Sequence, residues 1–246
     1  MTHSLQLSSN IAGPLPGDTF LGGDLSSILA HADRLKGGAS PTGGASDRPL
    51  LGRNIALLRP RPSGTEMPVL QRAALDLGAR VAHVRLGPPI DPAGTRFRGL
   101  SQMLGRLYDA IDCSGLAPAV VRQIEQHAGV PVYDDLQGPD HPARALADLM
   151  TLRDHGCMPG PNAQIVFLGD PLSVRAKNFF ELARREGFCL RLPDPSGAAA
   201  DADFSVDAAD PDHWVLHAPS GPIEAAECAQ NHRFALQAML LATMPA

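Results

Sequence analysis

Four consecutive residues in the first third of the chain have the spacing of a helix cap. In Ser63-Gly64-Thr65-Glu66 a serine precedes a glutamate by three positions. This is the capping-box pattern, in which the serine accepts a hydrogen bond from the third helical amide and the glutamate returns to the serine amide. The alternative is a remodelled ligand site, because amides at a helix start also bind anions. A carboxylate there would repel an anion, so the pattern favours capping.

A histidine and an arginine stand at the start of a later predicted helix. His141 precedes a proline, which is favoured at the first helical position, so His141 is either a cap or a group that contacts a ligand. Arg144 follows in the first turn, where a positive charge opposes the helix dipole. We therefore expect a negative partner, either a bound anion or a carboxylate such as Glu66, Asp134 or Asp135. Internal pairing is favoured.

The chain offers no pattern typical of a metal or dinucleotide site. His213 and His217 are four residues apart, but the segment between them is predicted to be a strand, where this spacing is too long for a shared metal. The four cysteines lack a CxxC pair and are predicted to be reduced core residues. Gly169-Asp170-Pro171 joins a predicted strand to a helix, where open α/β sheets bind ligands, but it lacks GxGxxG. We predict no metal and no organic cofactor.

The elements that must position these residues alternate between short apolar runs and amphipathic stretches. This order is typical of parallel βαβ units, and the fold class is predicted to be α/β with two doubly wound parallel-sheet units, the second one shortened. An amphipathic helix is expected over about 25–35. The predicted strands are 54–58, 80–85, 110–113, 164–168, 189–192 and 214–217. The predicted helices begin near 70, 100, 118, 142, 171 and 224.

A Gly- and Pro-rich segment at 156–163 is predicted to separate the two units. We expect a flexible tail over 1–17, a first α/β domain over 18–157 and a shortened second domain over 162–246. The C-terminal helix of the second domain is expected to return to the first. Residues 193–212 are small, acidic and Pro-rich, and no element is predicted there.

The composition predicts a globular, cytoplasmic protein. The chain has 246 residues, of which 44% are hydrophobic, enough for one sizeable core or two small ones. Its net charge is -5 and its 21 basic residues are scattered, which argues against nucleic acid or an acidic membrane as partner. The N-terminus lacks the pattern of a signal peptide, and no apolar run reaches the roughly 18 residues of a spanning helix.

The segment 108–155 resembles the middle of the aspartate/ornithine carbamoyltransferase family, nearest the ornithine type. It contains DAI at 109–111, AGVPVY at 128–133 and, after HP at 141–142, ALADLMTLRDH at 145–155, in the family's order and spacing. Weaker similarities to the opening helix, the phosphate-loop unit and the final helix extend the resemblance over nearly the whole chain. The resemblance implies a carbamoyl-phosphate domain, an amino-acid domain and active sites shared within a trimer. The reaction is carbamoyl transfer to an amine, without metal or organic cofactor.

The resemblance also assigns positions in the family's phosphate site. The family motif Ser-Thr-Arg-Thr-Arg corresponds to residues 63–67, so Ser63 is kept while Thr65 and Met67 replace the two arginines and Glu66 stands between them. Arginines hold a phosphate dianion by charge-assisted hydrogen bonds. The loop has therefore lost two of its positive charges.

Further site positions differ from the family pattern in the same direction. Ser114 and His232 correspond to two other phosphate arginines. The carbamoyl-contacting His-Pro-Thr-Gln keeps His141 but has Arg144 in place of the glutamine, and the His-Cys-Leu-Pro loop keeps His217 only. The ornithine motif Asp-x-x-x-Ser-Met-Gly has no match in the second unit. These positions form the predicted site, with His141 as the catalytic candidate if catalysis is retained.

The substitutions predict loss of the family reaction. Charge-assisted hydrogen bonds contribute roughly 1.5–3 kcal/mol each, so four missing arginines remove on the order of 6–12 kcal/mol of phosphate binding. We therefore predict a homotrimeric pseudoenzyme, a non-catalytic binding or regulatory homologue whose ligand is a small anion or an amino acid. The alternative is an active carbamoyltransferase with a rebuilt phosphate site, in which Arg59, Arg61 or Arg144 replaces the lost charges.

Overall fold

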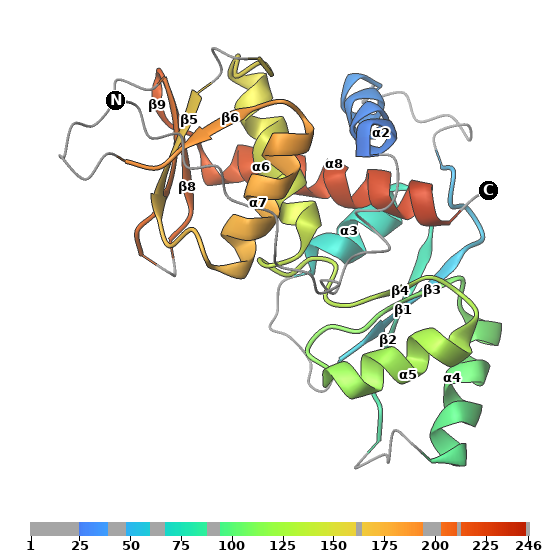
Figure 1. The fold of residues 1–246 in the computed structure, drawn as a ribbon. Coiled ribbons are helices and arrows are strands. Elements are labelled where there is room, and N and C mark those ends of the chain that lie inside the picture. Colours follow the sequence, from blue (N-terminus) through green and yellow to red (C-terminus); the bar gives the residue numbers. More distant parts are fainter. Residues whose placement is uncertain are drawn as a thin grey trace.

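The computed structural model describes residues 25–38, 48–59, 67–87, 94–160, 164–193, 203–210 and 213–244. The elements form two layered units with a long helix between them (Figure 1). The first unit contains a parallel sheet with strand order β2-β1-β3-β4. Its strands are β1 (Asn54–Leu58), β2 (Arg80–Val84), β3 (Ala110–Asp112) and β4 (Val132–Tyr133), and its helices are α3 (Val69–Asp76), α4 (Thr95–Leu107) and α5 (Pro118–Ala128).

Strand β1 shows why this sheet carries helices on both faces. Ile55 and Leu57 belong to one buried cluster, whereas Ala56 and Leu58 belong to another that also contains residues of α4 and α5. Successive side chains of a strand point to opposite faces, and a strand buried on both faces has a continuous apolar sequence. The run NIALL therefore predicts the central position that β1 occupies.

The second unit contains a sheet with strand order β6-β5-β7-β8-β9. Strands β6, β5 and β7 are parallel, and β8 and β9 extend this sheet in antiparallel fashion. The predicted parallel-sheet fold class is thus confirmed, with an antiparallel extension that the sequence did not reveal. The strands are β5 (Gln164–Gly169), β6 (Cys189–Arg191), β7 (Phe204–Ala208), β8 (Val215–Ala218) and β9 (Gly221–Pro222), and the helices are α6 (Pro142–Asp154) and α7 (Val174–Arg185).

Two local predictions in the second unit were wrong. Helix α7 begins at Val174 instead of Pro171, because Ser173 is its N-cap and accepts a hydrogen bond from the Ala176 amide at 3.3 Å. Strand β7 lies in the segment where no element was predicted. The cysteines are free, as expected, but only three are buried, because Cys189 is exposed on the edge strand β6.

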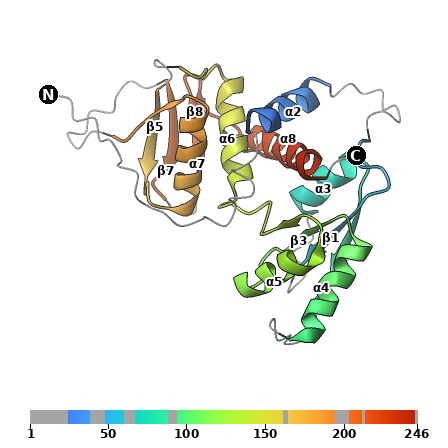
Figure 2. The ribbon, with the colours of Figure 1, turned by 45° about the vertical axis from the view of Figure 1, so that its right-hand side comes forward.

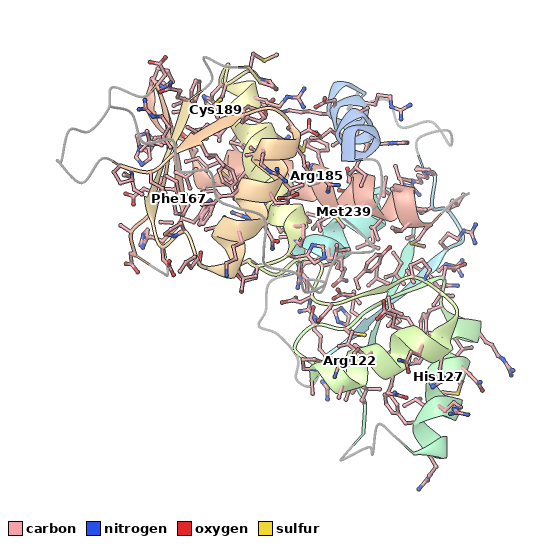
Figure 3. All side chains as sticks on the ribbon, viewed as in Figure 1. Arg122, His127, Phe167, Arg185, Cys189 and Met239 are labelled. Carbon is pink, nitrogen blue, oxygen red and sulfur yellow. The ribbon has the colours of Figure 1, made fainter. Side chains whose placement is uncertain are left out.

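Helix α8 (Ala225–Thr243) lies between the units and packs against α6, α3 and α2 (Leu25–Gly37) (Figure 2). One buried cluster contains residues of β1, of β5 and of α8. Phe167 of β5 and Met239 of α8 are both in this interior (Figure 3). The sheets therefore share one apolar core through α8. None of the described helices is both long and apolar enough to cross a membrane.

Candidate functional site

Four of the predicted site residues, Ser114, His141, Arg144 and His232, lie where the first sheet meets α6 and α8. Ser114 follows β3, a connector over residues 134–141 follows β4, and α6 begins at the end of this connector. The carboxyl ends of parallel strands are the edge at which open α/β sheets bind ligands. The structure brings Arg144 and His232 together near this edge of the sheet, and it places Ser114 between carboxyl groups.

Ser114 lies between two aspartates. Its Oγ is 2.7 Å from Asp112 Oδ2 and 2.8 Å from Asp135 Oδ1, and the other Asp112 oxygen accepts from the Leu136 amide at 3.0 Å. Asp112 is fully buried, and this burial raises its pKa to about 6, while the contacts with Ser114 and Leu136 partly oppose the rise. We call Asp112, Ser114 and Asp135 the carboxyl bridge.

The surroundings of the carboxyl bridge carry more negative than positive charge. Asp134 is next to it, and the pKa of Asp134 is raised by burial and by the charge of Asp135. Arg59, buried at the end of β1, is the cation that favours ionisation of Asp112. The position that the resemblance equates with a phosphate arginine is therefore occupied by a hydroxyl that contacts two acidic groups.

His141 is the N-cap of α6, and this confirms the capping interpretation. Its Nδ1 accepts a hydrogen bond from the Ala143 amide at 3.1 Å. The proton of the neutral ring therefore resides on Nε2. Burial lowers the pKa of His141 to about 4, so the ring is neutral at physiological pH. A neutral Nε2–H is also the group that could donate to a carbonyl oxygen.

Arg144 has an internal partner, but not one of the three carboxylates predicted for it. Its Nε is 3.7 Å from Asp148 Oδ1, one turn further along α6, and its Nη1 donates to His232 Nδ1 at 3.3 Å. The i,i+4 spacing of Arg144 and Asp148 is visible in the sequence and could have indicated this pair.

Asp148 connects Arg144 to a second arginine that sequence reasoning missed. Arg175 of α7 donates to Asp148 Oδ2 at 3.0 Å, and its guanidinium lies 4.0 Å from the centre of the Trp214 ring. The Asp148 side chain is 2% exposed, and such a carboxylate requires compensation by its partners. We call Arg144, Asp148, Arg175, Trp214 and His232 the buried arginine cluster.

His232 is a neutral member of this cluster. Because Nδ1 accepts from Arg144, the ring proton is on Nε2, and this buried Nε2 has no hydrogen-bond partner. Burial, together with the charges of Arg144, His141 and Arg175, lowers the pKa of His232 to about 3. The cluster therefore holds two guanidinium groups against one carboxylate.

The remaining predicted residues lie outside the described part of the chain or are separate from these groups. Ser63, Thr65 and Glu66 lie outside the described residues. Met67 is 46% exposed, and α3 begins at Val69 with Pro68 as its N-cap. The predicted capping box, Ser63 to Glu66, lies outside the described residues and stays a prediction.

The start of α3 contacts the connector, whereas His217 lies on a strand of the second sheet. The Leu70 amide of α3 contacts Gln137 Oε1 of the connector at 3.4 Å. His217 lies in β8, opposite Ser205 and Pro222. Within the described part of the chain, no hydrogen bond or ion pair links His217 to Arg144 or His232.

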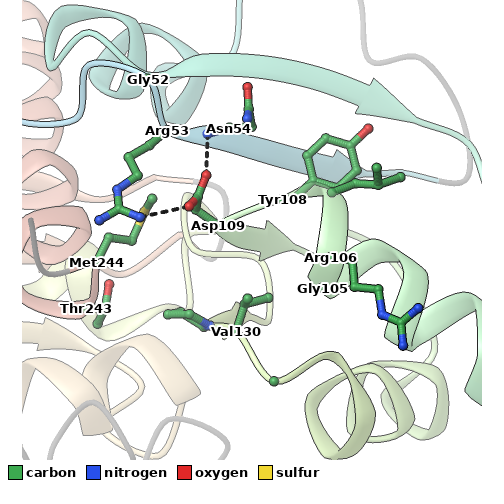
Figure 4. A pocket seen from close by; sticks show the side chains of 13 residues that line it. Gly52, Arg53, Asn54, Gly105, Arg106, Tyr108, Asp109, Val130, Thr243 and Met244 are labelled. Atoms are coloured by element: carbon green, nitrogen blue, oxygen red, sulfur yellow. Dashed lines mark hydrogen bonds and ion pairs between the residues drawn. The ribbon is translucent and has the colours of Figure 1, made fainter.

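An open pocket of about 610 Å³ lies at the opposite edge of the first sheet (Figure 4). At its base Arg53 Nη1 donates to Asp109 Oδ1 at 3.0 Å, and the Asn54 amide donates to Asp109 Oδ2 at 2.8 Å. These contacts lower the pKa of Asp109, the Asn54 amide contributing most. The residues that line the pocket include none of the carboxyl bridge or of the buried arginine cluster, so we assign it no role in the site. Among the described side chains, no group of three His, Cys, Asp or Glu is arranged to hold a metal ion.

Comparison with known proteins agrees with this architecture. No family model matches the chain. It is 33% identical over 161 residues to the catabolic ornithine carbamoyltransferase of Burkholderia mallei (strain ATCC 23344), a match that covers 63% of this chain and 46% of the relative. The same values hold for the catabolic enzyme of Burkholderia pseudomallei (strain K96243). The chain thus spans about half the length of the curated relatives it matches.

Solved structures match over more of the chain. The ornithine carbamoyltransferase from Burkholderia thailandensis E264 has a TM-score of 0.65 at 17% identity, covering 89% of this chain and 94% of that one. The enzyme from Thermus thermophilus has a TM-score of 0.61 at 21% identity, with 89% and 94% covered. The fold is therefore that of the carbamoyltransferases. In sequence, the chain is similar to ornithine carbamoyltransferases over 161 residues.

Proposed function

We propose that this chain is a non-catalytic cytoplasmic homologue of the ornithine carbamoyltransferases, which binds a small anion or an amino acid without transferring a carbamoyl group. The observation that carries the proposal is the carboxyl bridge. At a position that corresponds to a phosphate arginine, Ser114 is 2.7 Å from Asp112 and 2.8 Å from Asp135. A phosphate dianion placed there would meet two acidic groups where the family's arginine would offer charge-assisted donors.

His232 supports the same conclusion at a second position. It also corresponds to a phosphate arginine, yet it is neutral, with a pKa lowered to about 3, and its Nδ1 is used by Arg144. An arginine stays charged in proteins and offers five donors, whereas this ring offers only Nε2–H. Two of the positions that should hold phosphate thus carry no positive charge.

The direct test is an assay for citrulline formation from ornithine and carbamoyl phosphate. We expect no product above background, with the Burkholderia mallei relative as the positive control. Isothermal calorimetry should also detect no sub-millimolar binding of carbamoyl phosphate. If the wild type formed citrulline and His141→Ala did not, the result would contradict the proposal and give His141 the catalytic role.

The buried arginine cluster favours a second candidate function, an active carbamoyltransferase with a rebuilt anion site. Its two guanidinium groups face one carboxylate, and Arg175 Nε and His232 Nε2 are buried without a hydrogen-bond partner. Donors of this kind suit an anion. Calorimetry separates the two candidate functions. An active carbamoyltransferase must bind carbamoyl phosphate, must lose this binding in Arg175→Met, and must also form product.

We also propose that the chain forms a homotrimer through its first domain, and that 18–157 and 162–246 are its two domains. The segment that best resembles the family, 108–155, lies in the first of these. Its neighbour α4 exposes Met103 and Leu107, at 49% and 57%, and exposed apolar side chains of this kind suit an interface. Light scattering at micromolar concentration should give three times the mass of the chain. A monomer would contradict the trimer and any site shared between subunits.

A further inference from the structure

The hydrogens of the carboxyl bridge can be counted. The two oxygen–oxygen separations at Ser114, 2.7 and 2.8 Å, are both those of O–H···O hydrogen bonds. A serine hydroxyl has one hydrogen, and an ionised carboxylate has none. One hydroxyl can donate to Asp112 or to Asp135, but not to both. The second contact therefore needs a hydrogen that belongs to one of the two carboxyl groups.

Burial identifies the group that holds this hydrogen. Asp112 is fully buried, whereas Asp135 is only partly buried, and burial disfavours the charged form. Asp112 Oδ1 accepts from the Leu136 amide, which leaves Oδ2 to carry the proton toward Ser114. The arrangement is a chain in which Asp112 donates to Ser114 and Ser114 donates to Asp135.

The charges that face Asp112 come from both neighbouring strands. Arg59 of β1 favours its ionisation, and Asp135 favours its protonation. Tyr133 and Cys113 are neutral neighbours, because burial raises the pKa of both. The titratable groups around the bridge are Arg59 from the end of β1, Cys113 from the end of β3, Tyr133, Asp134 and Asp135 from β4 and the connector, and Glu125 of α5 on the side of Cys113.

The bridge also fixes the course of the connector 134–141. Asp135 has a φ of +51°, which is uncommon for a residue with a side chain. Its carbonyl accepts from the Gly138 amide at 2.7 Å, and the Gly138 carbonyl accepts from the His141 amide at 3.2 Å. The contacts of Asp112 with Ser114 and Leu136 are thus connected through two short turns to the N-cap of α6.

We propose that the carboxyl bridge is a pH-sensitive switch, which fixes the connector 134–141 to the first sheet while one proton is shared and loosens it when that proton is lost. Loss of the proton leaves two carboxylates on one hydroxyl, so one of the two contacts becomes repulsive. The switch operates whether or not the chain transfers carbamoyl groups. A negative result for the switch would therefore leave the outcome of the citrulline assay unchanged.

The sign of the effect follows from the raised pKa. Asp112 has a pKa of about 6 in the folded chain, above the ordinary value of 3.8 for an aspartate. The folded state therefore binds the proton more tightly, and this contribution to stability is present at low pH and is lost as the pH rises through about 6. Asp112→Asn replaces the proton by an amide hydrogen that pH does not remove.

The first experiment compares the thermal midpoint of the wild type and of Asp112→Asn between pH 4.5 and 8. We expect the wild-type midpoint to fall relative to that of Asp112→Asn as the pH rises from 4.5 to about 6, and the difference to stay constant at higher pH. His141 and His232 titrate in both proteins, so the difference isolates Asp112. Parallel profiles would overturn the proposal.

The second experiment needs no variant, so it stands if Asp112→Asn fails to fold. Carbon-13 NMR of the wild-type carboxyl groups should show Asp112 titrating near pH 6, and an Asp112 titration near pH 4 would overturn the proposal. Hydrogen exchange, corrected for the intrinsic rate, should show protection at 134–141 falling between pH 5 and 7.5. The amides of α7 should keep their protection over the same pH range. An equal fall in protection in the two segments would contradict a local switch.

Discussion

The two most deeply buried carboxyl groups, Asp112 and Asp148, have different partners. Asp112 contacts a hydroxyl and a backbone amide, whereas Asp148 contacts two guanidinium groups. A buried charge is tolerated only when it is paired and hydrogen-bonded. We therefore expect Asp148 to be structurally necessary as the shared partner of the two arginines, and Asp112 to hold its proton below a pH of about 6.

The role of Asp148 gives the first prediction. Asp148→Ala should lower the free energy of unfolding by about 3–5 kcal/mol, because it leaves Arg144 and Arg175 without their shared counterion. Urea denaturation at pH 7 measures the loss. Glu181→Ala is the matched control, since Glu181 pairs with Arg184 on the surface, and such pairs contribute about 0–1 kcal/mol. Equal losses in the two variants would show that burial of Asp148 adds nothing.

His141 gives a second prediction, in which capping and titration are separated. His141→Ala should cost about 0.5–2 kcal/mol through the lost cap, whereas His141→Asn should retain the stability at pH 7, because asparagine caps helices well. The folded pKa of His141, about 4, lies below the ordinary histidine value of 6.5. Its contribution is therefore present above pH 6.5 and is lost as the pH falls through about 4.

Urea denaturation at pH 7 and pH 4.5 tests both parts of this prediction. His141→Asn should lose less stability than the wild type on acidification, while His232, whose pKa is lowered in the same direction, acts equally in both proteins. If the wild type and His141→Asn lost the same free energy of unfolding on acidification, the result would contradict a neutral His141.

The sequence could predict some of these residues but not the cluster that they form. The cap was one of two roles predicted for His141, and it could be predicted because its signal is local, a proline at the next position. The pairing of Arg144 with Asp148 is also local, yet Arg175 and Trp214 come from α7 and from the segment before β8. No pattern of spacing joins positions so far apart in the chain, so their approach to Asp148 required the fold.

Among the elements, α4 and α5 approach each other closely at Gly105. A Cβ at Gly105 of α4 would lie 1.7 Å from the Ala128 carbonyl oxygen at the end of α5. Gly105→Ala should therefore destabilise the protein, because the two helices would have to separate. Gly99→Ala, in the same helix, meets nothing within 4 Å and should stabilise by about 0.5–1 kcal/mol. Thermal melts of the two variants should shift in opposite directions, and a shift of the same sign would show that α4 is not held against α5.

Helices and central strands were predictable from sequence because their apolar periodicity is continuous. Strand β7 was not, although Val206 is fully buried. Its neighbours Ser205 and Asp207 are polar and typical of loops, and the strand is defined by pairing with β5 and β8. The start of α7 was misplaced for a related reason, because Pro171 is a favoured first helical residue but Ser173 provides the actual cap.

At the scale of the whole molecule, the shared core predicts cooperative unfolding. Residues of both sheets and of α8 form one buried cluster, so neither unit can lose its packing without uncovering the other. Trp214, the single tryptophan, contacts Phe167 and Phe179 in the second unit. Its fluorescence and the far-ultraviolet circular dichroism of all helices should therefore change at the same urea concentration. Two separated transitions would show that the units are independent.

The position of α8 in the fold also has a consequence for how the chain is made. Ile55, Leu57 and Leu70 emerge from the ribosome early, yet the cluster that buries them includes Leu236, Met239 and Leu240. Their apolar surface stays exposed while more than a hundred further residues are translated, and surfaces of this kind attract chaperones or aggregate. The first sheet can assemble during synthesis, but the face that packs toward α8 is shielded from water only after α8 has left the exit tunnel.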